Sequence, residues 1–530
     1  MSKKKKPPEA AEGWQPEIEE LHWRREQARQ MGGAEALEKF RQRGLLNARQ
    51  RIDAMLDDGT FHEYGILAGA AQYDEAGRPV KVTPANHVMG TGEIDGRRVM
   101  CVADDFTLRG GSSESAVSDK WVYSERMAYE FRMPLVRLVD SAGGSVKLVE
   151  QMGRTKVPGY FLWPCVQLLG IVPVVSIALG ACAGLGAVRA ALSHFSIMVE
   201  GKAQIFAGGP PIVKQGIGRD IHKEELGGWK VHKHSGVVHN GVKTEEEGFA
   251  MVRRFLSYLP RHVWDVPERT APRPPLGDAE ELNKIVPRDR RRVFKSRKVI
   301  ELIFDEGSIF EIQPTFGASK ITCLARLDGY TVGVMADNSY VQGGSLTRDG
   351  AQKLEHFIDL CDTFHIPIIN LPDQPGTMIG VEAESIGTVL FAARATCAIE
   401  QATTPWVTVV LRRNFGLGGT MHGPWHGPTG TSMNHRFSWP SARWGSIPAE
   451  GGVAAAYRRE IEASDDPEAL RLELEEKYHQ LASPFRTAEK FGVVDVMEPA
   501  ETRKFLCDWI KDAYELSKTQ TGPLPRTMRV

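Results

Sequence analysis

The sequence has few cysteines, and they form no recognisable metal or redox motif. No Cys-x-x-Cys pair exists among the seven, which are Cys101, Cys165, Cys182, Cys323, Cys361, Cys397 and Cys507. Neither a zinc ribbon nor a dithiol redox centre is therefore indicated. An odd number of scattered cysteines in a long chain favours a reducing compartment. We expect the cytoplasm, or the mitochondrial matrix if the source is eukaryotic.

An excess of charge is also missing. Lysine and arginine number 66 against 67 aspartate and glutamate, which gives a net charge of −1 at pH 7. The overall balance gives no reason to expect a nucleic-acid partner. One long uncharged run, Leu168–Val188, approaches the roughly 20 residues of a membrane span. Pro173 and clustered glycines interrupt a helix there, and its valine and isoleucine content favours a strand, so we expect no membrane partner.

The motifs of side-chain catalysis are absent as well. The sequence contains no serine nucleophile elbow, no His/Asp triad, no His-Glu-x-x-His zinc helix and no Walker phosphate loop. Three histidines, His422, His426 and His435, lie in or beside a Gly/Pro loop. Their surroundings favour a loop that shapes a pocket, and we predict no metal site.

The alternation of segment types along the sequence predicts an α/β protein. Short aliphatic runs alternate with helical stretches and glycine turns, for example at Val99–Ala103, Leu135–Asp140 and Val172–Leu179. Such alternation indicates strands buried on both faces. The predicted organisation is a disordered basic tail (1–16), an N-terminal domain with a helical arm (17–270), a linker (271–292) and a C-terminal domain (293–530). The arginine run Arg288–Arg292 is interpreted as a solvated face of the linker.

The stretch Ile171–Val188 is the most informative. It predicts a buried strand, followed at Gly180–Ala187 by a glycine-rich turn that opens a helix. Backbone N–H groups at such a corner can hold a developing oxyanion. A strand-to-helix corner of small residues can equally serve tight packing alone. Both interpretations stand at this point.

The chain also repeats itself. Matching positions lie 233 residues apart (328 minus 95, 343 minus 110, 373 minus 140) or 232 apart (416 minus 184). They pair Asp95 with Asp328, Gly110–Ser112 with Gly343–Ser345, Asp140 with Asp373, and Gly184–Gly186 with Gly416–Gly418. Two tandem domains of one fold are the simplest account. Each half then places a Gly-Gly-Ser, a strand-end aspartate and a glycine corner at the carboxyl ends of strands, where ligands bind in α/β sheets. The two aspartates can act as acids or cap turns.

Several segments carry a family resemblance that extends from about Arg49 to Val496. They are Asp104–Ser115, Val199–Lys214, Glu225–Val237, Phe437–Pro440 and Ala449–Val453. With the glycine corners, they resemble the carboxyltransferase (β) subunit of biotin-dependent acyl-CoA carboxylases, the propionyl-CoA, methylcrotonyl-CoA and geranyl-CoA carboxylase group. The resemblance implies two crotonase-like domains, each a spiral of ββα units. It also implies a ligase that transfers CO2 from carboxybiotin to the α (or vinylogous γ) carbon of an acyl-CoA.

The resemblance further implies partners and site residues. Biotin is expected on a separate α subunit, because this chain has no Ala-Met-Lys-Met motif and no ATP-binding loop. A hexameric core is expected, with active sites where the N-domain of one subunit faces the C-domain of another. The thioester enolate would be held by Gly184, Leu185, Gly186 and Ala187, and the biotin urea oxygen by Gly416, Leu417, Gly418 and Gly419. Cofactor-binding candidates are Gly110, Gly111, Lys120, Asp140, Gly143, Gly144, Gly376, Glu384, Asn434 and Trp439.

The chain departs from the family pattern beside these corners. The usual Asp-Ser-Gly-Gly-Ala-Arg is replaced after Asp140 by Ser-Ala-Gly-Gly-Ser, and Asp-x-Pro-Gly-Phe becomes Asp373-Gln-Pro-Gly-Thr377. Asn434 occupies the position of an aspartate that helps to set acyl size, and an unusual loop, His422–Pro428, precedes it. We expect a non-standard acyl group. A decarboxylase or transcarboxylase subunit of the same fold, or an inactive assembly scaffold, are the alternatives.

Overall fold

The computed structural model describes residues 13–112, 118–144, 146, 150, 153, 162–289, 291–420, 423–424 and 435–530. The chain forms two compact units. Unit 1 contains residues up to 164 together with 176–190 and 201–226, and unit 2 contains 165–175, 191–200 and 227–530. The predicted domain boundaries at the 271–292 linker stay a prediction.

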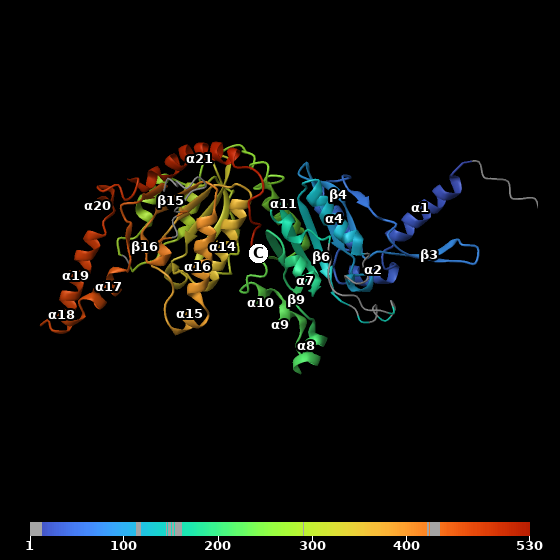
Figure 1. The fold of residues 1–530 in the computed structure, drawn as a ribbon, viewed down its shortest axis with the longest axis horizontal. Coiled ribbons are helices and arrows are strands. Elements are labelled where there is room, and N and C mark those ends of the chain that lie inside the picture. Colours follow the sequence, from blue (N-terminus) through green and yellow to red (C-terminus); the bar gives the residue numbers. More distant parts are fainter. Residues whose placement is uncertain are drawn as a thin grey trace, which may run out of the picture. The chain divides into compact units, whose positions relative to one another are not determined.

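Unit 1 has a mixed sheet with helices against it (Figure 1). Its elements are α1 (Gln15–Arg29), α2 (Ala34–Gln42), α3 (Ala48–Met55), β1 (His62–Tyr64), β2 (Gly69–Tyr73), β3 (Pro79–Pro84), β4 (His87–Ile94), β5 (Arg97–Asp104), η1 (Arg109–Gly111), α4 (Ser118–Glu130), β6 (Leu135–Ser141), β7 (Val174–Ala183), α7 (Leu185–Ala191), β9 (Gln204–Phe206), α8 (Pro210–Ile217) and α9 (Lys223–Gly227).

The sheet of unit 1 follows the order β1-β4-β5-β6-β7, and β9 pairs with β7. The first two pairings are antiparallel, and β5 runs parallel to β6. Every residue of β6 is buried, as the aliphatic run Leu135–Asp140 predicted. Strands with near-continuous aliphatic sequence need cover on both faces, and α3 and α4 pack against β5.

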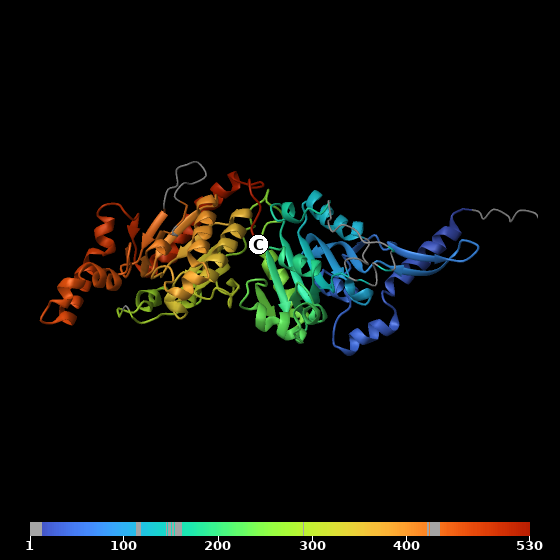
Figure 2. The same cartoon turned by 60° about the horizontal axis from the view of Figure 1, so that its bottom comes forward.

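Unit 2 holds the second sheet and a helical extension (Figure 2). Its elements are α6 (Cys165–Leu168), β8 (Phe195–Val199), α10 (Trp229–His232), β10 (Asn240–Val242), α11 (Glu245–Ser257), η2 (Ala279–Glu281), α12 (Leu282–Ile285), α13 (Ser296–Ile303), β11 (Phe310–Ile312), β12 (Lys320–Leu327), β13 (Tyr330–Asp337), η3 (Gln342–Gly344), α14 (Arg348–Thr363), β14 (Ile368–Leu371), α15 (Val381–Ser385), α16 (Thr388–Gln401), β15 (Trp406–Val410), β16 (Arg413–Phe415), η4 (Leu417–Thr420), β17 (His435–Ser438), β18 (Arg443–Gly445), α17 (Ala449–Ala456), α18 (Arg458–Glu462), α19 (Pro467–Leu481), α20 (Pro484–Ala488), β19 (Asp495–Val496), η5 (Pro499–Glu501) and α21 (Thr502–Thr519).

The main sheet of unit 2 follows the order β11-β12-β13-β14-β15-β17-β19. Its first three strands are antiparallel and the remaining pairings are parallel. The core joins strand residues such as Val334, Ile369 and Val407 to Leu506 and Ile510 of α21. α14 also packs against the sheet, with α16 packed on α14 (Figure 1). The predicted α/β class is therefore confirmed.

The two sheets share one order of elements and the same backbone conformation at matching positions. The helix before the first strand, the β-hairpin, the 3-10 turn and the following helix recur in the same order, as α3-β4-β5-η1-α4 and as α13-β12-β13-η3-α14. Left-handed residues recur with them at the predicted spacing of 233, since φ is 51° at both Asp95 and Asp328, and 64° and 63° at Gly110 and Gly343. The duplicated fold inferred from the sequence repeat is thus visible in the dihedral angles.

The uncharged run Leu168–Val188 forms β7 and α7 with their flanks. Across the described parts of the chain, no helix has the length and apolar character that crossing a membrane requires.

Candidate functional site

The glycine corner of unit 1 joins β7 to α7. The strand continues to Ala183, so only Gly184, with φ of 53°, makes the turn. The prediction that the turn begins at Gly180 is therefore wrong. Gly180 is a strand residue that lets another chain segment approach, because a Cβ there would lie 2.2 Å from Asp140 Oδ1.

The amides of the first turn of α7 make this corner a donor site. The helix begins at Leu185, and the Val188 N–H donates to the Gly184 carbonyl at 3.1 Å. The N–H groups of Leu185, Gly186 and Ala187 belong to the first turn of the helix, where no carbonyl of the helix is in position to accept a hydrogen bond from them. They can therefore donate to an external acceptor. All four residues predicted from the sequence therefore lie at one strand-to-helix corner.

The loop after Asp140 lies directly against this corner. A Cβ on Gly186 would lie 2.9 Å from Ser141 Cβ and 3.0 Å from the Ser141 carbonyl oxygen. A Cβ on Gly143 would lie 2.8 Å from the Ala183 carbonyl oxygen. Ser112 Oγ donates to the Gly143 carbonyl at 2.5 Å, and Ser141 Oγ to the Gly111 carbonyl at 2.8 Å. Two of the predicted glycines thus permit the close approach that fixes the loop on the corner.

Asp140 itself is the partner of a buried arginine. Arg51 Nη1 lies 2.9 Å from Asp140 Oδ2, and both side chains are almost fully buried. Beside it, Asp104 accepts from Arg189 at 2.9 Å and contacts His87 Nδ1 at 3.1 Å. Burial alone would raise the pKa of Asp104, but Arg189 and His87 together hold that pKa below its usual value. These aspartates are therefore charged anchors of the sheet edge.

The corner of unit 2 has the same construction. β16 ends at Phe415, Gly416 turns the chain with φ of 63°, and η4 begins at Leu417. A Cβ on Gly418 would lie 2.3 Å from Gln374 Oε1, so Gln374 occupies the position that Ser141 has in unit 1. The second glycine of each corner is thus pressed against the residue that follows a strand-end aspartate.

Gln374 is held from both ends. In the orientation that satisfies its neighbours, Nε2 donates to the Gly418 carbonyl at 2.5 Å, and Oε1 accepts from Lys320 Nζ at 2.8 Å. Lys320 also donates to Asp337 and to the Gly344 carbonyl. Burial lowers the pKa of Lys320, although Asp337 acts in the opposite direction. Because C=O and N–H are antiparallel in a trans peptide, fixing the Gly418 carbonyl aims the Gly419 N–H away from Gln374.

Asp373 is neutralised as Asp140 is. Arg412 binds both of its carboxylate oxygens, at 3.0 and 2.7 Å, and Arg413 does so at 2.8 and 2.9 Å. The Asp373 N–H donates to Asp337 Oδ2 at 2.8 Å. A completely buried aspartate with two arginines supports a fixed loop rather than proton transfer.

Comparison with known proteins identifies the family. The model of the carboxyl transferase domain family matches residues 39–527. The chain belongs to the carboxyl transferase domain family. The predicted family, that of biotin-dependent carboxyltransferase subunits, is confirmed, and so is the prediction that the chain is an enzyme.

Two relatives of this carboxyl transferase chain are similar along almost their whole length. A propionyl-CoA carboxylase carboxyltransferase subunit of Haloferax mediterranei is 34% identical, over 92% of this chain and 94% of the relative. A methylmalonyl-CoA carboxyltransferase 12S subunit of Propionibacterium freudenreichii subsp. shermanii is 33% identical, over 96% of this chain and 95% of the relative.

A solved structure agrees with the carboxyl transferase fold. The transcarboxylase 12S hexamer, with methylmalonyl-coenzyme A and methylmalonic acid bound, superposes with a TM-score of 0.84. It is 29% identical and covers 98% of this chain and 99% of its own. The prediction of two tandem crotonase-like domains is therefore confirmed.

The other predicted site residues of this carboxyl transferase chain lie at different distances from the corners. Gly110 and Gly111 form η1, and a Cβ on Gly111 would lie 2.3 Å from the Asp140 carbonyl oxygen. Gly144 follows Gly143 in the loop. Gly376, with φ of 129°, would place a Cβ 3.5 Å from the Phe415 carbonyl oxygen, which is the counterpart of the Gly143 contact.

Three candidates lie apart from the corners. Lys120 on α4 is buried beside the Arg49–Glu63 ion pair, and burial lowers its pKa to about 8. Glu384 is exposed on α15. Trp439 is a core residue whose indole N–H donates to Thr502 Oγ1 at 2.9 Å. Asn434, His422 and His426 lie outside the described residues, and within those residues no cluster of metal-ligating side chains occurs.

Sequence reasoning missed the residues that hold the corners in place. Arg51, Arg189, Lys320 and Gln374 have no motif of their own. One available signal was Gln374 itself. It follows the strand-end aspartate Asp373, whereas the small residue Ser141 follows Asp140 in the first repeat. The others are set by contacts between distant segments, such as Arg51 with Asp140.

Proposed function

We propose that the chain is the carboxyltransferase subunit of a biotin-dependent acyl-CoA carboxylase. The observation that carries the proposal is the pair of corners, at Gly184 and Gly416, which share one backbone geometry and the same packed loop. Two backbone donor sites suit a transfer in which negative charge develops on two carbonyl oxygens, one on each reactant.

In this proposal each corner binds the carbonyl oxygen of one reactant. The amides of Leu185, Gly186 and Ala187 hold the thioester oxygen of the acyl-CoA when the α (or vinylogous γ) proton leaves. The amides of Gly418 and Gly419 hold the urea oxygen of biotin. When bound, carboxybiotin supplies the CO2 and a basic urea oxygen. Backbone donors are preorganised, and each can contribute about 3 kcal/mol to the transition state.

The residues at the unit 2 corner suit the biotin ring, because negative charge develops on its urea oxygen during the transfer. The strand-end carboxylate, Asp373, is already bound by two arginines and does not repel an anion at the corner. Gln374 and Lys320 hold the peptide plane of Gly418 and so position the donor. No side-chain base is required from this chain if the urea oxygen takes the proton.

Exposed apolar helices support a homo-oligomer, for which we propose a hexameric core. Ile212 and Ile217 of α8 are 67% and 74% exposed in unit 1, and Val381 and Leu390 of α15 and α16 are 86% and 64% exposed in unit 2. Apolar side chains this exposed are typical of interaction surfaces. Biotin is expected on a separate α subunit.

The acyl-CoA-dependent decarboxylation of free N-carboxybiotin by the purified chain tests the proposal. Activity is expected in the wild type, and Gly186→Val and Gly418→Val are each expected to reduce it at least about 100-fold. Gly451→Val is the matched control, because the nearest heavy atom to a Cβ there, Ile447 Cγ2, is 4.0 Å away. If the wild type is inactive, or if both corner variants keep its rate, the proposal is wrong.

A second candidate is a transcarboxylase subunit, which moves a carboxyl group from an acyl-CoA to another acceptor by way of biotin, and the name of the 12S relative favours it. The partner distinguishes the two candidates, because both share the half-reaction between carboxybiotin and an acyl-CoA, and a partner without ATP-dependent biotin carboxylase activity supports the second. Co-purification of an ATP-dependent biotin carboxylase subunit supports the first candidate instead.

A further inference from the structure

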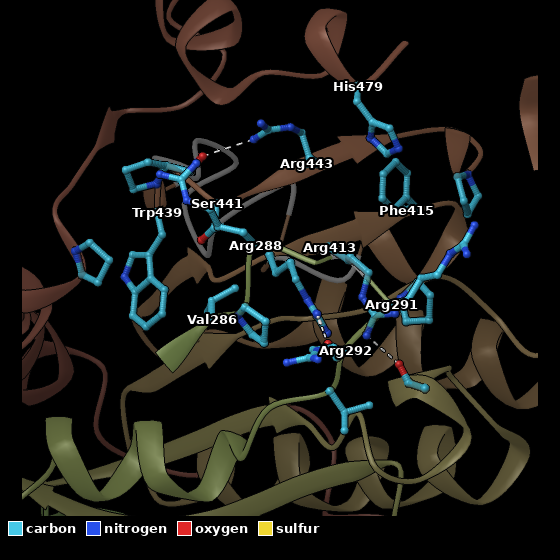
Figure 3. A pocket seen from close by; sticks show the side chains of 18 of the residues that line it. Val286, Arg288, Arg291, Arg292, Arg413, Phe415, Trp439, Ser441, Arg443 and His479 are labelled. Atoms are coloured by element: carbon cyan, nitrogen blue, oxygen red, sulfur yellow. Dashed lines mark hydrogen bonds between the residues drawn. The ribbon is translucent and has the colours of Figure 1, made fainter. Parts of the chain in front are cut away.

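Unit 2 contains a large cavity next to its glycine corner, since Phe415, which precedes Gly416, and Pro375, which follows Gln374, both line it. Its volume is about 910 Å³, and it lies between the 286–293 segment, the end of β16 and the 439–450 segment (Figure 3). Cavities of roughly 300–1,000 Å³ hold small-molecule ligands. The cavity is therefore large enough for a molecule the size of a nucleotide.

The lining is rich in arginine. Three separate segments contribute the six guanidinium groups, which belong to Arg288, Arg291, Arg292, Arg412, Arg413 and Arg443. Among the described residues that line the same space, the carboxylates are those of Glu450 and Glu498. Because the arginines come from three segments that surround one volume, their positive charge is concentrated inside it. Arg288, Arg291 and Arg292 are exposed, as a solvated linker would be, but their side chains also face this cavity (Figure 3).

The arginines differ in how far they are already neutralised. Arg412 and Arg413 share buried Asp373, and Arg412 also donates to the Arg292 carbonyl at 2.6 Å, which ties the linker to the sheet. Arg292 lies 3.8 Å from Asp289. Within the described part of the chain, neither Arg288 nor Arg291 forms an ion pair. Glu468 interacts electrostatically with Arg291 at longer range, but neither guanidinium group is bound by a carboxylate of the described residues, so both can bind a ligand.

The wall between the arginines is apolar and contains one unsatisfied polar side chain. Phe415 and several prolines form the apolar part. His479 is 5% exposed, and among the described residues neither of its ring nitrogens has a hydrogen-bond partner, although Nε2 lies 3.7 Å from Glu450. Figure 3 shows its ring beside Phe415 at the cavity. A buried imidazole without a partner is costly, and a ligand that supplies a hydrogen bond removes that cost.

We propose that this cavity binds a phosphorylated nucleotide, with its phosphates on Arg288 and Arg291 and its base against Phe415 and His479. Arginine binds phosphate oxygens through two parallel N–H groups, which favours phosphate over a single carboxylate. A planar base fits the apolar wall, and its ring nitrogens can pair with the imidazole. The nucleotide can be free or can be the 3′-phosphoadenosine part of coenzyme A. A free nucleotide goes beyond the proposed carboxyl transfer, whereas the coenzyme A form rests on that proposed function.

Calorimetric titration of the full chain with ADP, coenzyme A and inorganic pyrophosphate tests the site. The wild type is expected to bind ADP or coenzyme A, and the double variant Arg288→Gln/Arg291→Gln to bind at least about tenfold more weakly. His479→Leu is expected to weaken nucleotide binding but to leave pyrophosphate binding unchanged. Arg458→Gln, an exposed arginine paired with Glu462 on α18, is the matched control and is expected to bind as the wild type does.

Each outcome decides the proposal. Binding of ADP that depends on Arg288 and Arg291 supports a free nucleotide, and the same dependence for coenzyme A alone supports its nucleotide part. No binding of any of the three probes overturns the site, as does ADP binding that the double variant retains; coenzyme A binding that the double variant retains belongs to the acyl-CoA site of the proposed function and does not support this cavity. Binding of poly-glutamate but of no small molecule would show an acidic protein surface instead and also overturns it. Thermal unfolding of each variant checks that it is folded. The decarboxylation assay tests the proposed carboxyl transfer, and its result is independent of the ADP titration.

Discussion

The Nε2 atoms of His239 and His356 lie 2.7 Å apart in the buried core of unit 2. The Ser196 N–H donates to His239 Nδ1 at 2.9 Å, so the proton of neutral His239 is on Nε2. His239 Nε2 then donates toward His356 Nε2, which also lies 3.2 Å from the His194 carbonyl oxygen, and the backbone of Arg529 is a further hydrogen-bond partner of His356. Protonation of either imidazole breaks this chain, because two N–H groups would face each other.

The histidine pair predicts a loss of stability in mild acid. Burial lowers the pKa of both His239 and His356, and neighbouring histidines lower that of His239 further, while Asp359 opposes the shift at His356. The unfolded chain therefore takes up protons first as pH falls through about 6.5, so folding free energy declines below that pH. Thermal midpoints are expected to fall between pH 7.5 and 5.5, and to fall less in His356→Gln. The exposed His62→Gln is the control, and an equal slope in all three proteins would contradict the prediction.

Gln374 is predicted to act as a positioning residue for the unit 2 corner. Gln374→Leu removes the hydrogen bonds to the Gly418 carbonyl and to Lys320, so the peptide plane of the corner is no longer fixed. We expect kcat for carboxyl transfer to fall about 10-fold to 100-fold, with the KM for acyl-CoA nearly unchanged. Gln374→Glu keeps the acceptor for Lys320 and should recover part of kcat. A rise in KM alone would contradict this role.

The Arg51–Asp140 pair is predicted to dominate the stability of unit 1. Arg51→Met leaves the Asp140 carboxylate buried without its partner, which typically costs about 3–5 kcal/mol. The midpoint of thermal unfolding should fall by several degrees, and the double variant Arg51→Met/Asp140→Asn should recover much of the loss. The exposed pair of Arg41 and Glu38 provides the control, since Arg41→Met removes an ion pair expected to contribute less than about 1 kcal/mol. Equal losses in the two single variants would refute the prediction.

Lys120 is predicted to lose its charge in mildly alkaline solution. Burial lowers its pKa to about 8, with Arg49 acting in the same direction and Glu63 against it. Between about pH 8 and the higher pKa of the unfolded chain, the unfolded state binds the extra proton, so stability rises with pH through that window. If Lys120 contacts coenzyme A phosphates, Lys120→Met should raise the KM for acyl-CoA several-fold at pH 7. Lys243→Met, at an exposed lysine, should leave this KM unchanged. An unchanged KM in Lys120→Met would show that Lys120 does not bind coenzyme A.

The glycine corners show how far the sequence alone could lead. A spacing of 232 or 233 residues was enough to predict a duplicated α/β fold and to pair Gly184 with Gly416, because local backbone conformation follows local sequence. The role of Gly180 was mistaken, since its contact is with Asp140 forty residues earlier along the chain. Partners such as Arg51 for Asp140 depend on which strands become neighbours, and no local pattern encodes that choice. Arg288, Arg291 and Arg292 are exposed, as the solvated linker face predicted, but no pattern in the sequence indicated the cavity wall opposite them, which the 412–415 and 439–443 segments help to form.

The shared left-handed positions also bear on the ancestry of the chain. Gln342 and Arg109 occupy one such position, and His365 and Arg132 another, although few residues other than glycine adopt this conformation. In each pair two unlike side chains therefore share one uncommon backbone turn, which points to descent from a single copied gene rather than to convergence. After the copying event, the turns stayed and the side chains around them diverged.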